Sequence, residues 1–129
     1  MTDAFRPSLD HVTIGVTEFP RARAFYDAAL APLGITRLYG DGETFAGYGA
    51  QRRAWFWIGH RAPAQTSAHI AFVAADRAMV DAFHRVAMAA GGRDNGPPGL
   101  RPQYHPNYYG GFVLDPDGHN IEAVCRNEE

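Results

Sequence analysis

An internal repeat with an offset of 58 residues constrains the fold of this chain more than any other feature. Residues 9–16 (LDHVTIGV) and 67–74 (SAHIAFVA) each have the pattern of a strand, and each precedes a helical pattern, at 20–34 and 77–92. The offset aligns five residue pairs: His11 with His69, Ala24 with Ala82, Phe25 with Phe83, Ala31 with Ala89, and Gly34 with Gly92. Each glycine falls where a helix C-cap is expected. The chain is therefore organised as two copies of one strand–helix unit.

Short aromatic and β-branched runs follow each helix and predict further strands. In the first half these runs are TRLYG, TFAGYG and RAWFWIG, and in the second half YYGGFVLD and HNIEAVCR flank a turn at 115–118 (DPDG). The pattern predicts an α+β fold in a single domain spanning 1–129. Its two βαβββ modules, at about 8–60 and 66–127, should form a cupped mixed sheet. One strand of the second module is not placed by the pattern.

Between residues 94 and 108 the chain carries four prolines and two glycines. Proline restricts the backbone and removes a hydrogen-bond donor. We therefore expect a long, stiffened loop or lid here, with weak strand propensity only around 101–104.

Composition excludes several classes of function. A net charge of −2 gives no electrostatic footprint for nucleic acid or an anionic membrane. The sequence shows neither a long apolar run nor a signal segment, so we expect a cytoplasmic protein. A single cysteine, Cys125, excludes an internal disulfide. All 12 basic residues are arginine, which excludes Schiff-base and P-loop lysine chemistry, and neither Ser8 nor Ser67 lies in a Gly-x-Ser-x-Gly motif.

Three ligand-type side chains are predicted on strand faces that point away from the helices. Side chains alternate between the two faces of a strand. His11 therefore lies on the other face from the apolar residues of 12–16, His69 on the other face from those of 70–74, and Glu122 on the other face from those of 121–125. Two imidazoles and one carboxylate with open positions suit a divalent transition metal that also binds water or substrate. A metal would also explain the carboxylate in an otherwise apolar strand.

Each of these residues has a simpler interpretation when taken singly. A strand histidine is more often a hydrogen-bonded structural residue, and Glu122 could be a solvated edge residue. The joint pattern favours the metal, because all three residues are in register with the duplication. Of the remaining histidines, His105 in the lid is either a surface residue or a substrate contact.

The three motifs resemble the vicinal oxygen chelate superfamily. LDHVTIGV resembles its first strand, SAHIAFVA the strand that opens its second module, and FVLDPDGHNIEAV its closing hairpin. The resemblance covers nearly the whole chain and implies that His11, His69 and Glu122 are the metal ligands. That superfamily includes glyoxalase I, fosfomycin-modifying thiol transferases, extradiol dioxygenases, methylmalonyl-CoA epimerase and bleomycin-resistance proteins. Glyoxalase I takes a fourth ligand from the last strand of its first module. In this chain RAWFWIG stands at that place and carries no side chain that can bind a metal. His60, which follows this run, is a candidate substitute for the fourth ligand.

The resemblance implies a metal-dependent enzyme that acts on a small oxygenated substrate, as a lyase, isomerase or thiol transferase of glyoxalase-like type. Its cofactor would be one divalent ion (zinc, nickel, manganese or iron(II)), and a thiol such as glutathione is a candidate cosubstrate. Two alternatives stay open. One is a non-catalytic drug- or ligand-binding protein of the bleomycin-resistance type, and the other is a small dioxygenase.

The resemblance and the lid together predict the remaining site residues. We expect His105 and Tyr108 to be catalytic, as hydrogen-bond donors or a proton shuttle. Five further residues are expected to contact the substrate: Arg101, Tyr104, Tyr109, Trp55 and Trp57. Trp55 and Trp57 could equally be core aromatics. Unpaired sheet edges and the aromatic-rich segment 44–58 also predict a homodimer that closes the cavity.

Overall fold

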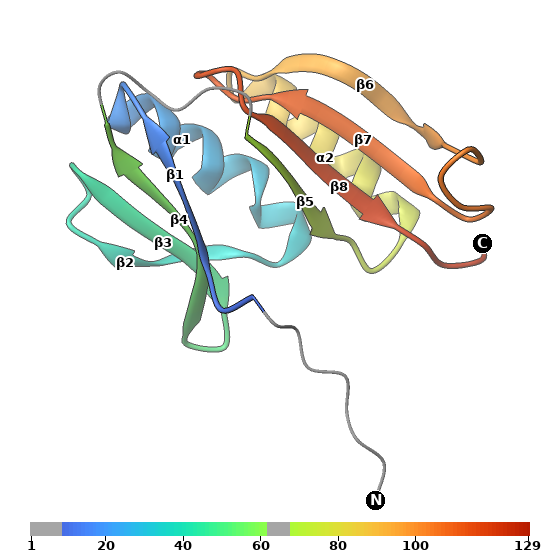
Figure 1. Cartoon of the computed structure of the whole chain (residues 1–129), viewed down its shortest axis with the longest axis horizontal. Helices are drawn as coiled ribbons and strands as arrows, with labels where there is room; N and C mark the ends of the chain where they lie inside the picture. Colours follow the sequence, from blue (N-terminus) through green and yellow to red (C-terminus); the bar gives the residue numbers. More distant parts are fainter. Residues whose placement is uncertain (1–8, 62–67) are drawn as a thin grey trace, which may run out of the picture.

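The structure, a computed structural model, describes residues 9–61 and 68–129 (Figure 1). The first module comprises β1 (Val12–Val16), α1 (Phe19–Ala29), a short 3-10 helix η1 (Ala31–Leu33), β2 (Thr36–Gly40), β3 (Phe45–Ala50) and β4 (Arg53–His60). The second comprises β5 (His69–Val73), α2 (Arg77–Ala89), β6 (Arg93–Leu100), β7 (Tyr109–Leu114) and β8 (Asn120–Cys125).

Each module forms a four-stranded mixed sheet with the same strand order. The orders are β1-β4-β3-β2 and β5-β8-β7-β6, and in each sheet the first pair is parallel while the others are antiparallel. The helices begin 58 residues apart, at Phe19 and Arg77, which matches the sequence repeat. The predicted α+β fold of two βαβββ modules is confirmed.

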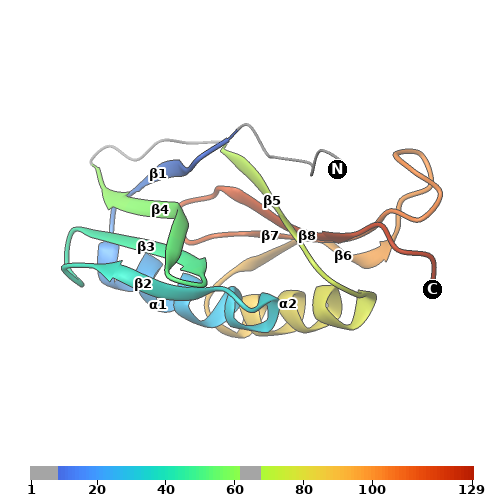
Figure 2. The same cartoon turned by 90° about the horizontal axis from the view of Figure 1, so that it is seen from below.

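Both helices lie on one side of the molecule and cover one face of each sheet (Figure 2). The strand residues predicted to face the helices are buried in the core, among them Ile14, Val16, Phe72, Ile121 and Ala123. Phe25 and Tyr26 of α1 pack edge to face, with ring centroids 4.9 Å apart. The opposite faces of the sheets, here called the open faces, carry the candidate site.

The prediction of a loop or lid over 94–108 is wrong for the first half of this segment. Residues 93–100 form β6, the edge strand of the second sheet, which pairs with β7 through two register shifts between Asp94 and Gly99. Pro97 and Pro98 lie within the second shift. An edge strand tolerates proline because its outer side needs no ladder partner. Only 101–108 form a loop, which is closed by a hydrogen bond of 2.7 Å from Arg101 N–H to the carbonyl oxygen of Tyr108.

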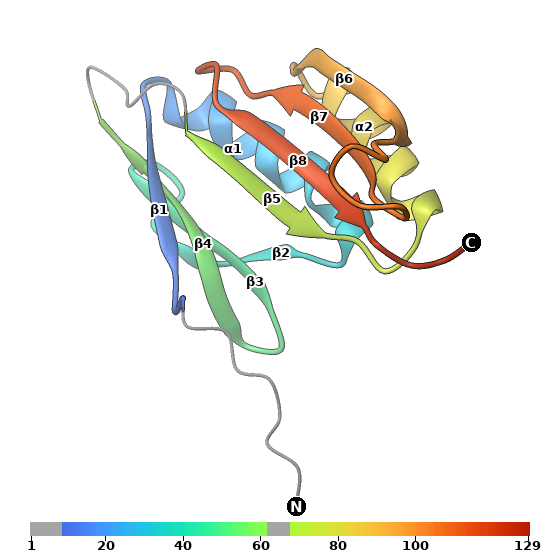
Figure 3. The ribbon, with the colours of Figure 1, turned by 45° about the vertical axis from the view of Figure 1, so that its right-hand side comes forward.

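Buried polar contacts join the two modules where β1 ends. His119, fully buried in the β7–β8 connection, accepts a hydrogen bond at Nδ1 from the N–H of Ala68 (3.3 Å) and donates from Nε2 to the carbonyl oxygen of Gly15 (3.0 Å). The hydroxyl of Thr17 donates to Asp117 (2.6 Å). These contacts place the end of β1 beside the start of β5, and from there the two strands splay apart like the arms of a V (Figure 3). None of the helices in the described segments is long and apolar enough to span a membrane.

Candidate functional site

A buried carboxylate with two polar partners lies on the open face of the second sheet. Glu122 is 1% exposed. Its Oε1 lies 2.9 Å from Nε2 of His69, and its Oε2 accepts a hydrogen bond from the hydroxyl of Tyr108. Because a buried carboxylate is costly without donors, these two partners account for the glutamate in β8. We call His69, Tyr108 and Glu122 the carboxylate cluster.

Strand register and one glycine assemble this cluster. In the parallel β5–β8 pair, Ala71 lies opposite Glu122, so His69 projects onto the same face two residues earlier. Gly110 in β7 leaves the room that the cluster needs. A Cβ atom there would lie 3.0 Å from Cε1 of Tyr108 and 3.3 Å from Oε2 of Glu122.

Tyr108 is held in its protonated form. Burial first, and then the hydrogen bond to Glu122 and the negative charge of that group, raise the pKa of its phenol to about 12, whereas Arg126 opposes the shift. The guanidinium of Arg126 lies over the Tyr108 ring, 5.0 Å from its centroid. At neutral pH Tyr108 is therefore protonated and acts as a hydrogen-bond donor.

His11 lies on the open face of the first sheet, with 55% of its side chain exposed. Its Nδ1 is 2.7 Å from Oδ2 of Asp10, whose Oδ1 accepts a hydrogen bond from Arg53 (2.8 Å). The His11 hydrogen bond and then the Arg53 charge lower the pKa of Asp10. With Nδ1–H donating to the carboxylate, Nε2 carries the lone pair. A carboxylate partner of this kind orients many metal-binding histidines.

The fold separates His11 from the carboxylate cluster within one chain. Gly15 touches His119 beside the start of β5, and His11 lies four residues back along β1, about 13 Å from Gly15 at the usual strand rise. Among residues 9–61 and 68–129, no group of three or more His, Cys, Asp or Glu side chains is placed to hold a metal ion. The predicted ligands His69 and Glu122 come together, and His11 does not join them in one chain.

The residues of a single chain fit a divalent ion in part. Two ligand atoms about 2.1 Å from one ion and at right angles to each other are about 3 Å apart, close to the 2.9 Å between His69 Nε2 and Glu122 Oε1. The Nε2 proton would have to leave on metal binding. On the same open face, Oδ1 of Asn120 is buried and lacks a hydrogen-bond partner within the described segments. A single chain thus offers two of the three predicted ligands and one unsatisfied oxygen nearby.

Trp57 occupies in the first module the position that Glu122 occupies in the second. Trp57 pairs with Thr13, and Glu122 with Ala71, which lies 58 residues after Thr13. The Trp57 ring lies against Gly47, where a Cβ would come within 2.6 Å of it. Tyr39 and Phe45 stack against the same indole, with ring centroids at 6.2 and 6.3 Å. At the position equivalent to Glu122 the first module therefore presents an aromatic surface and no ligand-type side chain.

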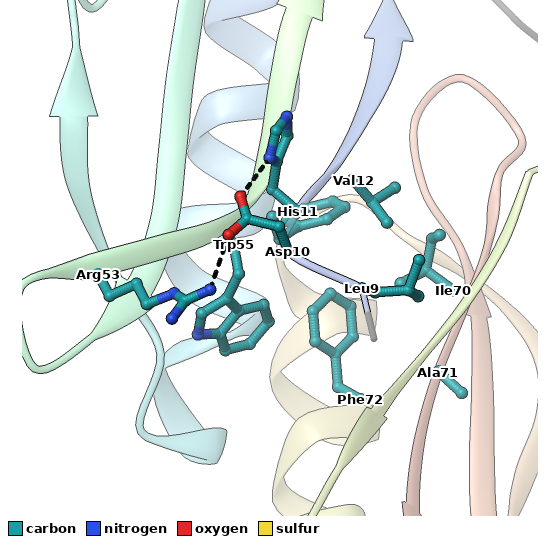
Figure 4. A pocket seen from close by; sticks show the side chains of 10 residues that line it. Leu9, Asp10, His11, Val12, Arg53, Trp55, Ile70, Ala71 and Phe72 are labelled. Carbon is teal, nitrogen blue, oxygen red and sulfur yellow. Dashed lines mark hydrogen bonds and ion pairs between the residues drawn. The ribbon is translucent and has the colours of Figure 1, made fainter. Parts of the chain in front are cut away.

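A cavity of about 590 Å³ lies between β1, β4 and the unpaired edge of β5 (Figure 4). Its walls are mainly apolar and include Val12, Trp55, Ile70 and Phe72, while Asp10, His11 and Arg53 form a polar rim. Trp55 lies against Phe72, with ring centroids 5.9 Å apart. Trp55 therefore lines a cavity, which its predicted role as a substrate contact requires.

The other predicted site residues lie at different distances from the carboxylate cluster. Tyr104 is 64% exposed and meets Tyr108 edge to face at 5.2 Å. His105 Nδ1 accepts a local hydrogen bond from the N–H of Asn107 (3.1 Å). Tyr109 faces the helices, where its hydroxyl donates to Asp81 of α2 (2.6 Å). The loop therefore places Tyr108 in the cluster and Tyr104 beside it, whereas Tyr109 projects from the opposite face.

Three further residues at these sites were not identified from the sequence. Asp10 and Arg53 hold His11, and Arg126 covers Tyr108. Asp10 could have been found as the carboxylate next to a predicted ligand. Arg53 and Arg126 gave no signal, because their roles depend on contacts between segments far apart in the chain.

The family model for the Glyoxalase/Bleomycin resistance protein/Dioxygenase superfamily matches residues 8–123. A glyoxalase/bleomycin resistance protein from Albidiferax ferrireducens T118 is 30% identical, with a TM-score of 0.81 over 94% of this chain and 100% of that one. A family enzyme from Burkholderia phytofirmans PsJN is 16% identical (TM-score 0.70; 94% and 100% covered). Lactoylglutathione lyase from Agrobacterium tumefaciens is 17% identical (TM-score 0.66; 93% and 95% covered). None of the curated proteins matches the sequence.

Proposed function

The chain belongs to the Glyoxalase/Bleomycin resistance protein/Dioxygenase superfamily, and on this premise we propose that it is a metal-dependent enzyme acting on a small oxygenated substrate, as a lyase, isomerase or thiol transferase. The observation that carries the proposal is the carboxylate cluster. A carboxylate that is 1% exposed, an imidazole 2.9 Å away and a protonated phenol gather on an open sheet face. Clusters of this kind are typical of sites that bind metals and move protons.

Each residue of the cluster has a distinct role in this proposal. A bound divalent ion would supply Lewis acidity toward a substrate oxygen. His69 and Glu122 would hold that ion through Nε2 and Oε1. Tyr108, whose raised pKa keeps its proton in place, donates a hydrogen bond to Glu122 and would serve as a hydrogen-bond donor to a substrate oxygen at the same site. A thiol such as glutathione is the cosubstrate in the transferase version of this reaction.

We extend the proposal to a homodimer in which a second copy supplies His11. His11 is half-exposed, is held by Asp10 and lies far from its own cluster, which suits a ligand directed at another molecule. The unpaired edges of β1 and β5 and the exposed aromatic side chains Tyr39 and Phe45 would be covered in such a dimer. The aromatic surface around Trp57 would then face the cluster of the partner.

Metal binding by mixed dimers tests this arrangement. One copy carries His11→Ala, and the other carries His69→Ala with Glu122→Gln. If His11 acts across the dimer, the purified mixed dimer keeps one intact site and binds half the zinc of the wild-type dimer, while both mutant homodimers bind little. His84→Ala, which changes a histidine of α2 whose ring contacts Asp94, is the matched control. Nickel, manganese and iron(II) are measured in the same way.

Each outcome bears on a separate part of the proposal. If the wild-type dimer binds zinc and the mixed dimer binds none, His11 acts within its own chain. A monomer by light scattering at micromolar concentration would overturn the dimer. Wild-type protein that binds none of the four metals would overturn the metal-dependent enzyme.

A ligand-binding protein of the bleomycin-resistance type is the second candidate, and the cavity favours it. A volume of about 590 Å³ with mostly apolar walls is within the range of small-molecule sites. Such a protein would bind an apolar aromatic probe such as 8-anilinonaphthalene-1-sulfonate equally well with and without metal. The enzyme requires metal for turnover.

A further inference from the structure

Two arginines flank the carboxylate cluster, and each covers an aromatic ring of the open face. The guanidinium of Arg101 lies 5.5 Å from the ring centroid of Phe112, and that of Arg126 lies 5.0 Å from that of Tyr108. Phe112 is directly opposite Glu122 in the β7–β8 pair and is 6.2 Å from the His69 ring.

The two rings converge at one point of the open face. From the Cβ position of Gly110, Cε1 of Tyr108 is 3.0 Å away, Oε2 of Glu122 is 3.3 Å away and Cε1 of Phe112 is 3.6 Å away. The carboxylate therefore lies close to both rings, and a guanidinium group lies over each of these rings. The loop bond from Arg101 N–H to the Tyr108 carbonyl oxygen fixes the segment that carries Arg101.

The arrangement leaves a surplus of positive charge. Among the described residues, neither Arg101 nor Arg126 forms an ion pair with a carboxylate, whereas Arg21, Arg37 and Arg53 each do. Arg101 donates one hydrogen bond, to the carbonyl oxygen of Pro97 (2.7 Å). A guanidinium has five N–H donors, so most of those on Arg101 remain for a ligand. Beside the carboxylate cluster, the two guanidinium groups therefore outnumber the single carboxylate of Glu122.

We propose that Arg101 and Arg126 bind an oxyanion, a carboxylate or phosphate group of the substrate, at the edge of the carboxylate cluster. Guanidinium groups match such anions with paired hydrogen bonds, and stacking on Phe112 and Tyr108 pre-orients both of them. The inference rests on the proposed function for the identity of the ligand as substrate. It narrows the substrate class from small oxygenated molecules to anionic ones.

Anion binding by the metal-free protein tests this site. Inorganic phosphate and lactate are titrated separately, and the Nε–H signals of the arginine side chains are followed by NMR. We expect saturable shifts of the Arg101 and Arg126 signals. Arg101→Gln and Arg126→Gln should each weaken binding about five- to tenfold, which corresponds to loss of one charged hydrogen-bond partner at a partly exposed site. Preference for phosphate or lactate identifies the kind of oxyanion.

Two controls make the result specific. Arg85→Gln, on the exposed surface of α2, removes the same charge far from the cluster and should leave the affinity unchanged. Arg126→Lys keeps the charge without the forked donor and should retain part of the affinity. Shifts that do not saturate, or equal weakening by Arg85→Gln, would overturn the oxyanion site. Zinc binding in phosphate-free buffer is measured on the same variants, so failure of the metal site and failure of the anion site are told apart.

Discussion

At the scale of single residues, the stability of the protein depends on the hydrogen-bond partners of the buried Glu122 carboxylate. Its two oxygens have one partner each, the His69 imidazole and the Tyr108 hydroxyl. An acceptor that loses its partner in the interior keeps its desolvation cost. The pair Tyr108 and Tyr104 offers a clean comparison, because the hydroxyl of the first is bound to Glu122 and the ring of the second is mostly exposed.

Tyr108→Phe should therefore destabilise the protein by about 1–3 kcal/mol, since it removes the donor to Oε2 and keeps the ring. Urea unfolding followed by circular dichroism measures this loss. Tyr104→Phe is the matched control and should change stability by less than about 0.5 kcal/mol. Equal effects from the two variants would mean that the Tyr108 hydroxyl adds nothing to the cluster.

The raised pKa of Tyr108 predicts a titration at high pH. Its phenol should ionise near pH 12, as seen in the difference in ultraviolet absorbance between wild type and Tyr108→Phe. Glu122→Gln removes the neighbouring negative charge and should lower this pKa toward 10. Because the folded protein keeps a proton that the unfolded chain loses near pH 10, the contribution of Tyr108 to stability should fall between pH 10 and 12. Ionisation near pH 10 in the wild type would contradict the contact.

At the scale of elements, glycines in β3 and β7 make room for side chains of β4 and β8, the last strand of each module. Gly110 in β7 faces Glu122, and Gly47 in β3 faces Trp57. Gly110→Ala should shift Tyr108 and Glu122, reduce stability by about 1–3 kcal/mol and weaken zinc binding. Gly59→Ala is the control, since a Cβ there meets nothing within 4 Å. Thermal unfolding and a zinc titration of both variants check the prediction, which wild-type values for Gly110→Ala would refute.

The sequence predicted those elements whose local pattern agrees with their tertiary role. β1, β5 and both helices followed the repeat, and alternation identified most of the helix-facing residues of β1, β5 and β8. β6 was missed because Pro97 and Pro98 mark a loop locally, and only the edge position and the register shifts make a strand possible there. The pairing of Glu122 with Tyr108 was likewise beyond local patterns, since the loop geometry of 101–108 determines it. Alternation predicted that His11 lies on an open face. It could not predict at which end of the cavity between β1 and β5 His11 lies.

At the scale of the whole molecule, the two modules share one hydrophobic core and are also joined by polar contacts from a single connection. The β7–β8 turn contacts the first module through His119 to Gly15, Asp117 to Thr17 and Asp115 to Tyr26, the last at 2.5 Å. Asp115 is 1% exposed, and burial followed by the charge of Asp115 raises the pKa of Tyr26 well above its ordinary value. Together with the packing of Phe56 against Phe72, these contacts hold the two sheets against each other.

His119→Ala should therefore loosen the joint between the modules as well as lower stability. The change leaves the Gly15 carbonyl oxygen and the Ala68 N–H without their imidazole partner and opens a cavity at a fully buried site, for an expected loss of about 2–4 kcal/mol. Hydrogen exchange should show faster exchange at the Ala68 amide and in neighbouring β5, with little change inside β2–β3. His60→Ala, at an exposed strand end, should leave both stability and exchange unchanged. Uniform acceleration across both modules would mean that His119 supports the fold as a whole and has no particular role at the joint between the modules.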